Sequence, residues 1–171
     1  MRNLAYGMKN NKIVMKRFLC LFFVFSSSLN ICFSQSGNQF HELIIESMKC
    51  RIDIVNYYQN RGILSPLDKI IFLRDNFPDD FPFEETEKEL GIVFFEKSLF
   101  SKSELRRGIG VNKLAPIELN NDTISIGFID YSLQIRNKQI NLANGGITTC
   151  KFVLNSQTKQ WEKKECKDCG I

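Results

Sequence analysis

The stretch that decides the fold is Val111–Lys167, with the sequence VNKLAPIELNNDTISIGFIDYSLQIRNKQINLANGGITTCKFVLNSQTKQWEKKECK. It alternates extended, apolar-rich segments with short polar turn sequences, which is typical of consecutive antiparallel strands. The predicted strands are Val111–Leu119, Thr123–Arg136, Gln139–Leu154 and Gln160–Cys166. We therefore expect a mainly antiparallel sheet in the C-terminal half, with everything before it serving export or covering the sheet.

Two Asn-containing turns set the expected register of this sheet, because Asn tolerates the positive φ of short hairpin loops. Loops of two residues at Asn120–Asn121 and Asn137–Lys138 bring apolar residues opposite one another, as a single buried face requires. The expected pairs are Ile117 with Ile124, Ala115 with Ile126, Ile135 with Ile140, and Leu133 with Leu142. Pro116 lacks an N–H donor, which favours an edge position for the first strand.

The longest strand changes its apolar phase partway along. Ile124 and Phe128 share one face, whereas Tyr131 and Leu133 share the other. A β-bulge near Gly127–Ile129 would produce this slip and bend the sheet. Gly145–Gly146 is either a matching bend in the partner strand or a separate tight turn.

Charge gives no argument for nucleic-acid binding. The chain has 171 residues, which predicts one folded domain, and a formal net charge of +4 from 23 basic and 19 acidic residues. Residues 1–34 contain five of the basic residues and no acid, so the remainder holds 23 − 5 = 18 basic against 19 acidic residues, a net of −1. We expect no nucleic-acid partner.

Met15–Ser34 resembles a bacterial secretory signal peptide. Lys16 and Arg17 precede the apolar Phe18–Phe25, and small polar residues follow. We expect cleavage before Gln35, so that residues 1–34 are an extension and signal peptide (15–34) and residues 35–171 are one α+β domain. Met15 is a candidate for the true start.

This leader places the mature protein in the periplasm or outside the cell. The apolar run is too short and too interrupted by serines for an anchor, so we expect no stable membrane insertion after cleavage. Lipidation of Cys32 is disfavoured because the large Ile31 precedes it, whereas lipoprotein sites usually have a small residue before the cysteine.

Helices are predicted before the sheet. Phe40–Arg61 has apolar residues at spacings of three and four and ends at Gly62 as a C′ glycine. Ser65–Leu73 carries an N-terminal cap sequence and predicts a second, buried helix. Ile92–Phe95 predicts a buried strand, and Ser101–Glu104 a capping box for a short third helix.

Few residues in the chain suggest catalysis. His41 is the only histidine and stands outside any motif, which argues against a histidine-based triad, and no glycine-rich phosphate loop is present. Arg51 falls within the apolar stripe of the first helix. We expect it to extend over the rim of the core, with a pocket cation as the alternative.

Four cysteines remain after the leader: Cys50, Cys150, Cys166 and Cys169. In an exported protein they predict structural disulfides, ahead of zinc binding or redox activity, and we expect no metal and no cofactor. A zinc site would need Cys50 and Cys150 to converge on Cys166-Lys167-Asp168-Cys169.

Strand parity favours one cysteine pairing. If Trp161 shares the core face with Cys150, an uninterrupted strand turns Cys166 to the other face, because 161 and 166 differ by an odd number. This disfavours a Cys150–Cys166 bridge. We predict a Cys50–Cys150 disulfide and a local Cys166–Cys169 loop.

The order of elements resembles nuclear-transport-factor-like (cystatin-like α+β) domains, in which a bent sheet wraps a long helix and leaves a conical pocket. We expect helices packed on a bent, mainly antiparallel sheet of four or five strands. The C-terminal Phe152…Trp161 hairpin also resembles that of small exported bacterial proteins with no assigned role.

Two classes of function follow. We expect a non-enzymatic binding or interaction module with a protein or small-molecule partner. The alternative is a small nuclear-transport-factor-like pocket enzyme, with Asp130 and Tyr131 at the strand bend as acid–base residues. A deep cavity containing Asp130 or Arg51 would favour the enzyme, and a filled core the binding module.

Overall fold

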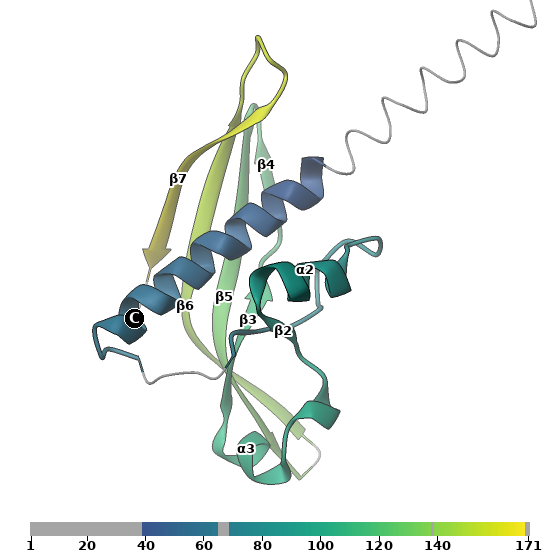
Figure 1. Cartoon of the computed structure of the whole chain (residues 1–171), viewed down its shortest axis with the longest axis vertical. Helices are drawn as coiled ribbons and strands as arrows, with labels where there is room; N and C mark the ends of the chain where they lie inside the picture. The colour runs from purple at the N-terminus through teal and green to yellow at the C-terminus, as the bar shows by residue number, and fades with distance from the viewer. Residues whose placement is uncertain (1–38, 65–68, 138, 170–171) are drawn as a thin grey trace, which may run out of the picture. The chain divides into compact units, whose positions relative to one another are not determined.

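The computed structural model describes residues 39–64, 69–137 and 139–169 of the chain (Figure 1). The chain divides into two units, Met1–Phe40 and His41–Ile171, and the architecture below is that of the second. The predicted signal peptide, its cleavage before Gln35 and the disfavoured lipidation of Cys32 lie outside the described residues, as do residues 65–68 at the predicted cap of the second helix.

A mixed sheet of seven strands runs through the described part of this unit, in the order β2-β1-β3-β5-β6-β7, with β4 paired to β5. Parallel pairing joins β1 to β2 and to β3, and antiparallel pairing joins the remaining neighbours. The strands are β1 Ile71–Phe72, β2 Val93–Phe94, β3 Ile109–Leu114, β4 Glu118–Asn120, β5 Thr123–Arg136, β6 Gln139–Leu154 and β7 Trp161–Cys169. The α+β class is confirmed, but the sheet has more strands than the four or five expected and one of its edges is parallel.

Helical elements flank this sheet, and the first long helix and the short α3 are those predicted from local sequence. A long helix covers residues 39–60, and Gly62 ends it at φ 70° while the Ile63 N–H donates to the Tyr58 carbonyl at 2.9 Å. This is the predicted C′ glycine in a Schellman arrangement. The shorter elements are α2 Phe83–Leu90, the 3₁₀ turn η1 Lys97–Leu99, and α3 Lys102–Arg107 with its predicted capping box between Ser101 and Glu104. Within the described segments, no helix has both the length and the apolar character needed to cross a bilayer.

The prediction of a helix extending to Leu73 is wrong where the structure describes it, because Ile71–Phe72 is strand β1. Phe72 packs against Phe128 on one side of the sheet, with ring centroids 5.2 Å apart. Ile71 and Leu73 belong to a buried cluster on the other side. An apolar run that is buried on both sides suits an internal strand as well as a buried helix, and the sheet decided between them.

The sheet buries different parts of its two faces. The helix 39–60 and α2 lie over one face, called here the helix side, and α3 lies at the lower end of the molecule in the view of Figure 1. The helix side holds a core that includes Ile44, Met48, Phe72, Phe94, Leu114, Ile126, Phe128 and Phe152. The opposite face, called the α3 side, holds a smaller cluster of Ile71, Leu73, Leu105, Val111 and Leu133.

These two cores explain the phase slip in β5 and correct the predicted bulge at Gly127–Ile129. The ladder between β3 and β5 is unbroken from Leu114↔Phe128 to Ile109↔Leu133, so it contains no extra residue. The first half of β5 buries its helix side and the second half buries its α3 side. An irregularity does occur one residue further on, between Asp130 and Tyr131, where the extra residue is Gly145 of β6.

The hairpin registers were predicted with mixed success. Ile135 pairs with Ile140 and Leu133 with Leu142, as expected from the turn at Asn137, whose φ is 51°. The first hairpin is shifted by two residues. Leu119, not Ile117, pairs with Ile124, because the turn lies at Asn121–Asp122.

The expected edge position of the first strand is wrong for β3 but fits β4, which pairs with β5 and lies off the main path of the described sheet. Pro116 separates β3 from β4, so its missing N–H falls in a break between strands. β3 itself is internal, between β1 and β5.

Candidate functional site

Arg51 lies at the centre of a buried polar network on the helix side of the sheet. Its side chain does not extend over the rim as expected, since only 4% of the residue is exposed. Its Nε donates to Asn112 Oδ1 at 2.9 Å, and Nη1 donates to Thr148 Oγ1 at 3.1 Å and to Asp168 Oδ1 at 3.4 Å. Nη2 forms an ion pair with Asp130 Oδ1. One guanidinium therefore joins the helix to strands β3, β5, β6 and β7.

A second layer of hydrogen bonds completes this network. Thr148 Oγ1 donates to Asp168 Oδ1 at 2.7 Å, and the Tyr58 hydroxyl donates to Asp168 Oδ2 at 3.3 Å. Asn112 Nδ2 donates to the Ile71 carbonyl at 2.9 Å. Among the described residues, every buried side-chain nitrogen or oxygen has a partner, as a stable buried polar network requires.

Strand register brings these residues together. Asn112 lies opposite Asp130, and Thr148 lies opposite both Phe128 and Asp168, so all four polar side chains share the helix side. Arg51 and Asp130 were candidates from the sequence, whereas Asn112, Thr148 and Asp168 were not. No local signal marks the missed residues, because their convergence depends on strand pairing across most of the domain.

Two carboxylates compete for one cation in this network. Burial raises the pKa of the Asp130 carboxyl above its ordinary value; Arg51 opposes the rise and Asp168 adds to it. Desolvation also raises the pKa of Tyr58, with Asp168 as the next cause. With both carboxylates ionised, the group formed by Arg51, Asp130 and Asp168 carries a net charge of −1.

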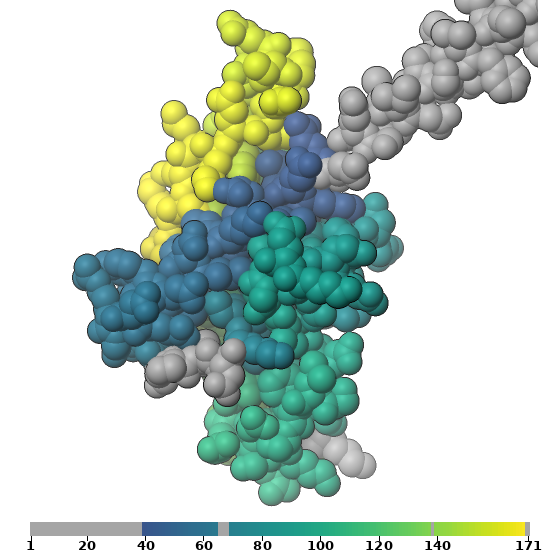
Figure 2. Space-filling model, in the orientation of Figure 1, coloured from purple at the N-terminus to yellow at the C-terminus, as the bar shows by residue number. Residues whose placement is uncertain are grey.

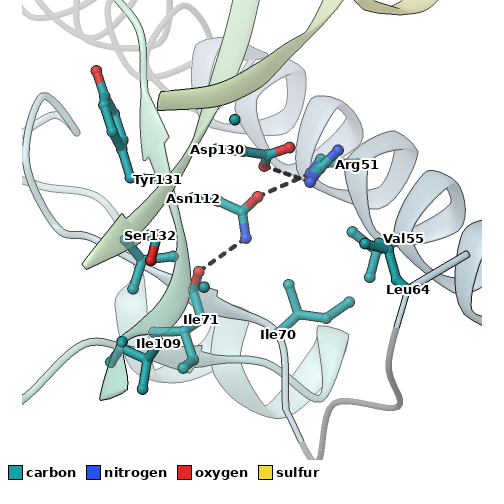
Figure 3. Close-up of a pocket in the computed structure, with 14 residues that line it drawn as sticks. Arg51, Val55, Leu64, Ile70, Ile71, Ile109, Asn112, Asp130, Tyr131 and Ser132 are labelled. Carbon is teal, nitrogen blue, oxygen red and sulfur yellow. Dashed lines mark hydrogen bonds and ion pairs between the residues drawn. The ribbon is translucent and has the colours of Figure 1, made fainter. Parts of the chain in front are cut away.

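A cavity of about 440 Å³ opens beside this network. Figure 3 shows Arg51, Asn112 and Asp130 directed toward one another at its polar end, with Val55 further along the helix of Arg51 and Ile70 below them in the view. The aliphatic residues of the lining are Val55, Leu64, Ile70, Ile71, Ile109 and Val111. The cavity therefore combines a mainly apolar wall with one polar end.

Tyr131 and Asp130 both line the cavity, but their side chains leave β5 on opposite faces. Neighbouring residues of a strand point to opposite faces, and Figure 3 shows the Tyr131 ring directed away from Arg51 and Asp130. The ring packs instead against the cluster on the α3 side. His41 is also apart from the network, in an exposed contact with Asp80 Oδ1 at 3.2 Å.

Three of the four cysteines converge next to the network. Cys166 lies within disulfide-bonding reach of both Cys50 and Cys150, with Cα–Cα distances of 6.8 and 4.1 Å. Cys169 is free and exposed. The predicted Cys50–Cys150 bond and Cys166–Cys169 loop are therefore not the pairings in the structure.

A bulge in β7 overturned the parity argument. Lys151 pairs with Glu165 but Phe152 pairs with Lys163, so Lys164 is an extra residue. The bulge reverses the facing of the residues beyond it. As a result Cys166 lies directly opposite Cys150, although Trp161 still pairs with Leu154.

Comparison with known proteins gives no relative for this chain: no protein-family model, no curated protein and no solved structure matches it.

Proposed function

We propose that the protein is an exported binding module that holds a small, largely apolar molecule in the cavity beside Arg51. The observation that carries this proposal is the cavity itself, whose volume of about 440 Å³ lies in the range of small-molecule sites of about 300–1,000 Å³. Aliphatic walls with a few convergent polar groups are the usual composition of such sites.

The polar end supports binding over catalysis. Arg51 is occupied by Asn112, Thr148, Asp168 and Asp130, so it is not free to stabilise a developing charge on a substrate. The Asp130 side chain is 21% exposed, which leaves it able to accept a hydrogen bond from a ligand. Because the charged group is net negative, the ligand we infer has an apolar body and one donor head, a hydroxyl or an amine, and no acid group.

Gly110 offers a direct test of occupancy. It lines the cavity from β3, and a Cβ at this position would meet no atom within 4 Å, so a larger side chain can grow into the open space. Gly110→Phe should fill the cavity while leaving the fold intact. Leu119→Phe is the matched control, because it adds the same ring at a site that is 67% exposed and outside the cavity lining.

The probe is 1-aminoanthracene, an apolar fluorophore with one amino donor, titrated into the purified protein. We expect binding by the wild type and by Leu119→Phe, and at least about tenfold weaker binding by Gly110→Phe, equivalent to about 1.4 kcal/mol. Equal binding by all three, or none by the wild type, would exclude the proposed ligand site. Circular dichroism checks that each variant is folded.

Export is the second part of the proposal, and it rests on the predicted leader Met15–Ser34. Intact-mass measurement on protein recovered from a periplasmic fraction should give a chain that begins at Gln35. Retention of the leader or a lipid on Cys32 would contradict it.

A pocket enzyme is the second candidate, because a cavity lined by Asp130 and Arg51 is the feature expected to favour an enzyme over a binding module. Asp130 lines the cavity and has a raised pKa, as a general base often does. This candidate is a nuclear-transport-factor-like domain, with a helix across a bent sheet beside a pocket, but without Tyr131 as the partner of Asp130. Asp130→Asn would then abolish conversion of any co-purified ligand, followed by mass spectrometry, while 1-aminoanthracene still bound.

A further inference from the structure

The cysteine cluster, defined as Cys50, Cys150 and Cys166, is a separate feature from the cavity. Each sulfur comes from a different element: the helix 39–60, β6 and β7 (Figure 2 shows the helix in blue and β7 in yellow side by side). All three sulfurs lie within 4.8 Å of one another. A metal site at these cysteines requires Cys50 and Cys150 to lie close to Cys166, and in the structure they do.

Disulfide bonding alone does not account for three sulfurs at one point. A sulfur forms one disulfide, so a bond from Cys166 to either partner leaves the third thiol of the cluster unpaired. Cys169 cannot take that thiol, because it lies opposite Ile147 on the other face of β7 and is exposed.

We propose that the reduced cysteine cluster binds one soft monovalent cation, Cu⁺, through three thiolates. Thiolates select soft ions such as Cu⁺ and Zn²⁺, but structural zinc sites are almost always four-coordinate. Among the described residues, no histidine, aspartate, glutamate or further cysteine completes the group. Cu⁺ forms stable complexes with three sulfur ligands, whereas Zn²⁺ would need a fourth ligand.

The surroundings suit a bound cation. Cys150 is 1% exposed and fixes the inner ligand, whereas Cys50 and Cys166 are half-buried and leave an approach from solvent. Three thiolates with one Cu⁺ leave a net charge of −2 at the site, and solvent at the open side stabilises this charge.

Metal binding and disulfide formation exclude each other here, because a disulfide consumes two of the three thiolates. The test therefore uses full-length mature protein that has been reduced and transferred, without reductant, to an anaerobic chamber. Cu⁺ is titrated against the chromogenic chelator bicinchoninate, which reports both stoichiometry and affinity. Ultraviolet sulfur-to-copper charge transfer reports the ligand type.

We expect one Cu⁺ per chain and tighter binding at higher pH, because each thiol must lose a proton to bind. Cys50→Ser and Cys166→Ser should each lower the affinity at least about tenfold. Cys150→Ala tests the buried ligand, and alanine is used there instead of serine so that no hydroxyl group is buried. Cys169→Ser is the matched control and should bind Cu⁺ as the wild type does.

Several outcomes would overturn the proposal. These are no binding by the reduced wild type, binding that survives Cys50→Ser and Cys166→Ser, or binding that Cys169→Ser removes. Tighter binding of Zn²⁺ than of Cu⁺ would contradict the proposed preference for Cu⁺. Loss of the far-ultraviolet dichroism on reduction alone would show that the sulfurs serve as an obligatory disulfide.

Discussion

The two faces of the sheet are buried by different kinds of core. The helix side combines an aromatic core, in which Phe72, Phe94 and Phe128 are fully buried, with an ionic network centred on Arg51. The α3 side relies on a small apolar cluster under a helix of six residues. β5 passes from one core to the other, and Asp130 lies close to the change.

This difference separates the roles of the two faces. A buried ion pair costs desolvation that its attraction only partly returns, so the network is weak evidence for stability. A small apolar cluster, by contrast, stabilises the fold through the burial of its side chains. We therefore place the polar end of the cavity on the helix side and assign to the α3 side the anchoring of the far half of β5, with Ile71 and Val111 of its cluster also lining the cavity. Four predictions test this contrast.

The largest effect is expected on the helix side, from Arg51→Met. It leaves Asp130 and Asp168 as two carboxylates without their cation, and removal of one partner of a buried ion pair costs about 3–5 kcal/mol. Urea unfolding should show a loss of about 4 kcal/mol. The triple variant Arg51→Met, Asp130→Asn, Asp168→Asn should recover part of this lost stability. If Arg51→Met alone is as stable as the wild type, the network is not formed.

The next effect belongs to the α3 side. Leu133 is 2% exposed within the small cluster, so Leu133→Ala should cost about 3 kcal/mol through lost burial and a cavity. Leu119→Ala, at a position 67% exposed, is the control and should stay within about 0.5 kcal/mol of the wild type. Equal losses at the two positions would contradict the assignment of an α3-side core.

A smaller effect on stability tests the contribution of α3, the short helix on the α3 side of the sheet. Ser101 accepts from the Glu104 N–H at 3.2 Å, while Glu104 accepts from the Ser101 N–H at 2.8 Å. Ser101→Ala should cost about 1 kcal/mol, as loss of an N-cap usually does. Thermal unfolding measures it, and an unchanged melting temperature would show that α3 contributes little to the fold.

The smallest effect is a change in pH dependence on the helix side. Asp130 has a pKa raised above its ordinary value of 3.8. The folded state therefore holds this proton more tightly than the unfolded chain, so Asp130 favours folding at low pH and loses that contribution as pH rises through the folded pKa. The stability of the wild type relative to Asp130→Asn should fall as pH rises across this window. A difference that grows with rising pH would show that the ion pair with Arg51 outweighs burial.

By itself the sequence determined the features that depend on a few neighbouring residues. The amphipathic helix with its end at Gly62, the capping box at Ser101–Glu104 and the hairpin at Asn137 all appear as predicted. Each is decided by backbone preference, side-chain capping or apolar spacing within one or two turns of chain, and these do not depend on the rest of the fold.

Only the tertiary structure decided which residues share a face. The bulge at Lys164 leaves no distinct mark in the sequence, and the glycines at 145 and 146 fit a bend or a tight turn equally well, yet each bulge inverts the facing of the residues beyond it. The bulge at Lys164 brought Cys166 opposite Cys150, and strand pairing placed Asn112, Thr148 and Asp168 around Arg51. The predicted helix at Ile71–Phe72 failed for a related reason. An apolar run fits a helix or an internal strand equally well until the sheet provides neighbours on both sides.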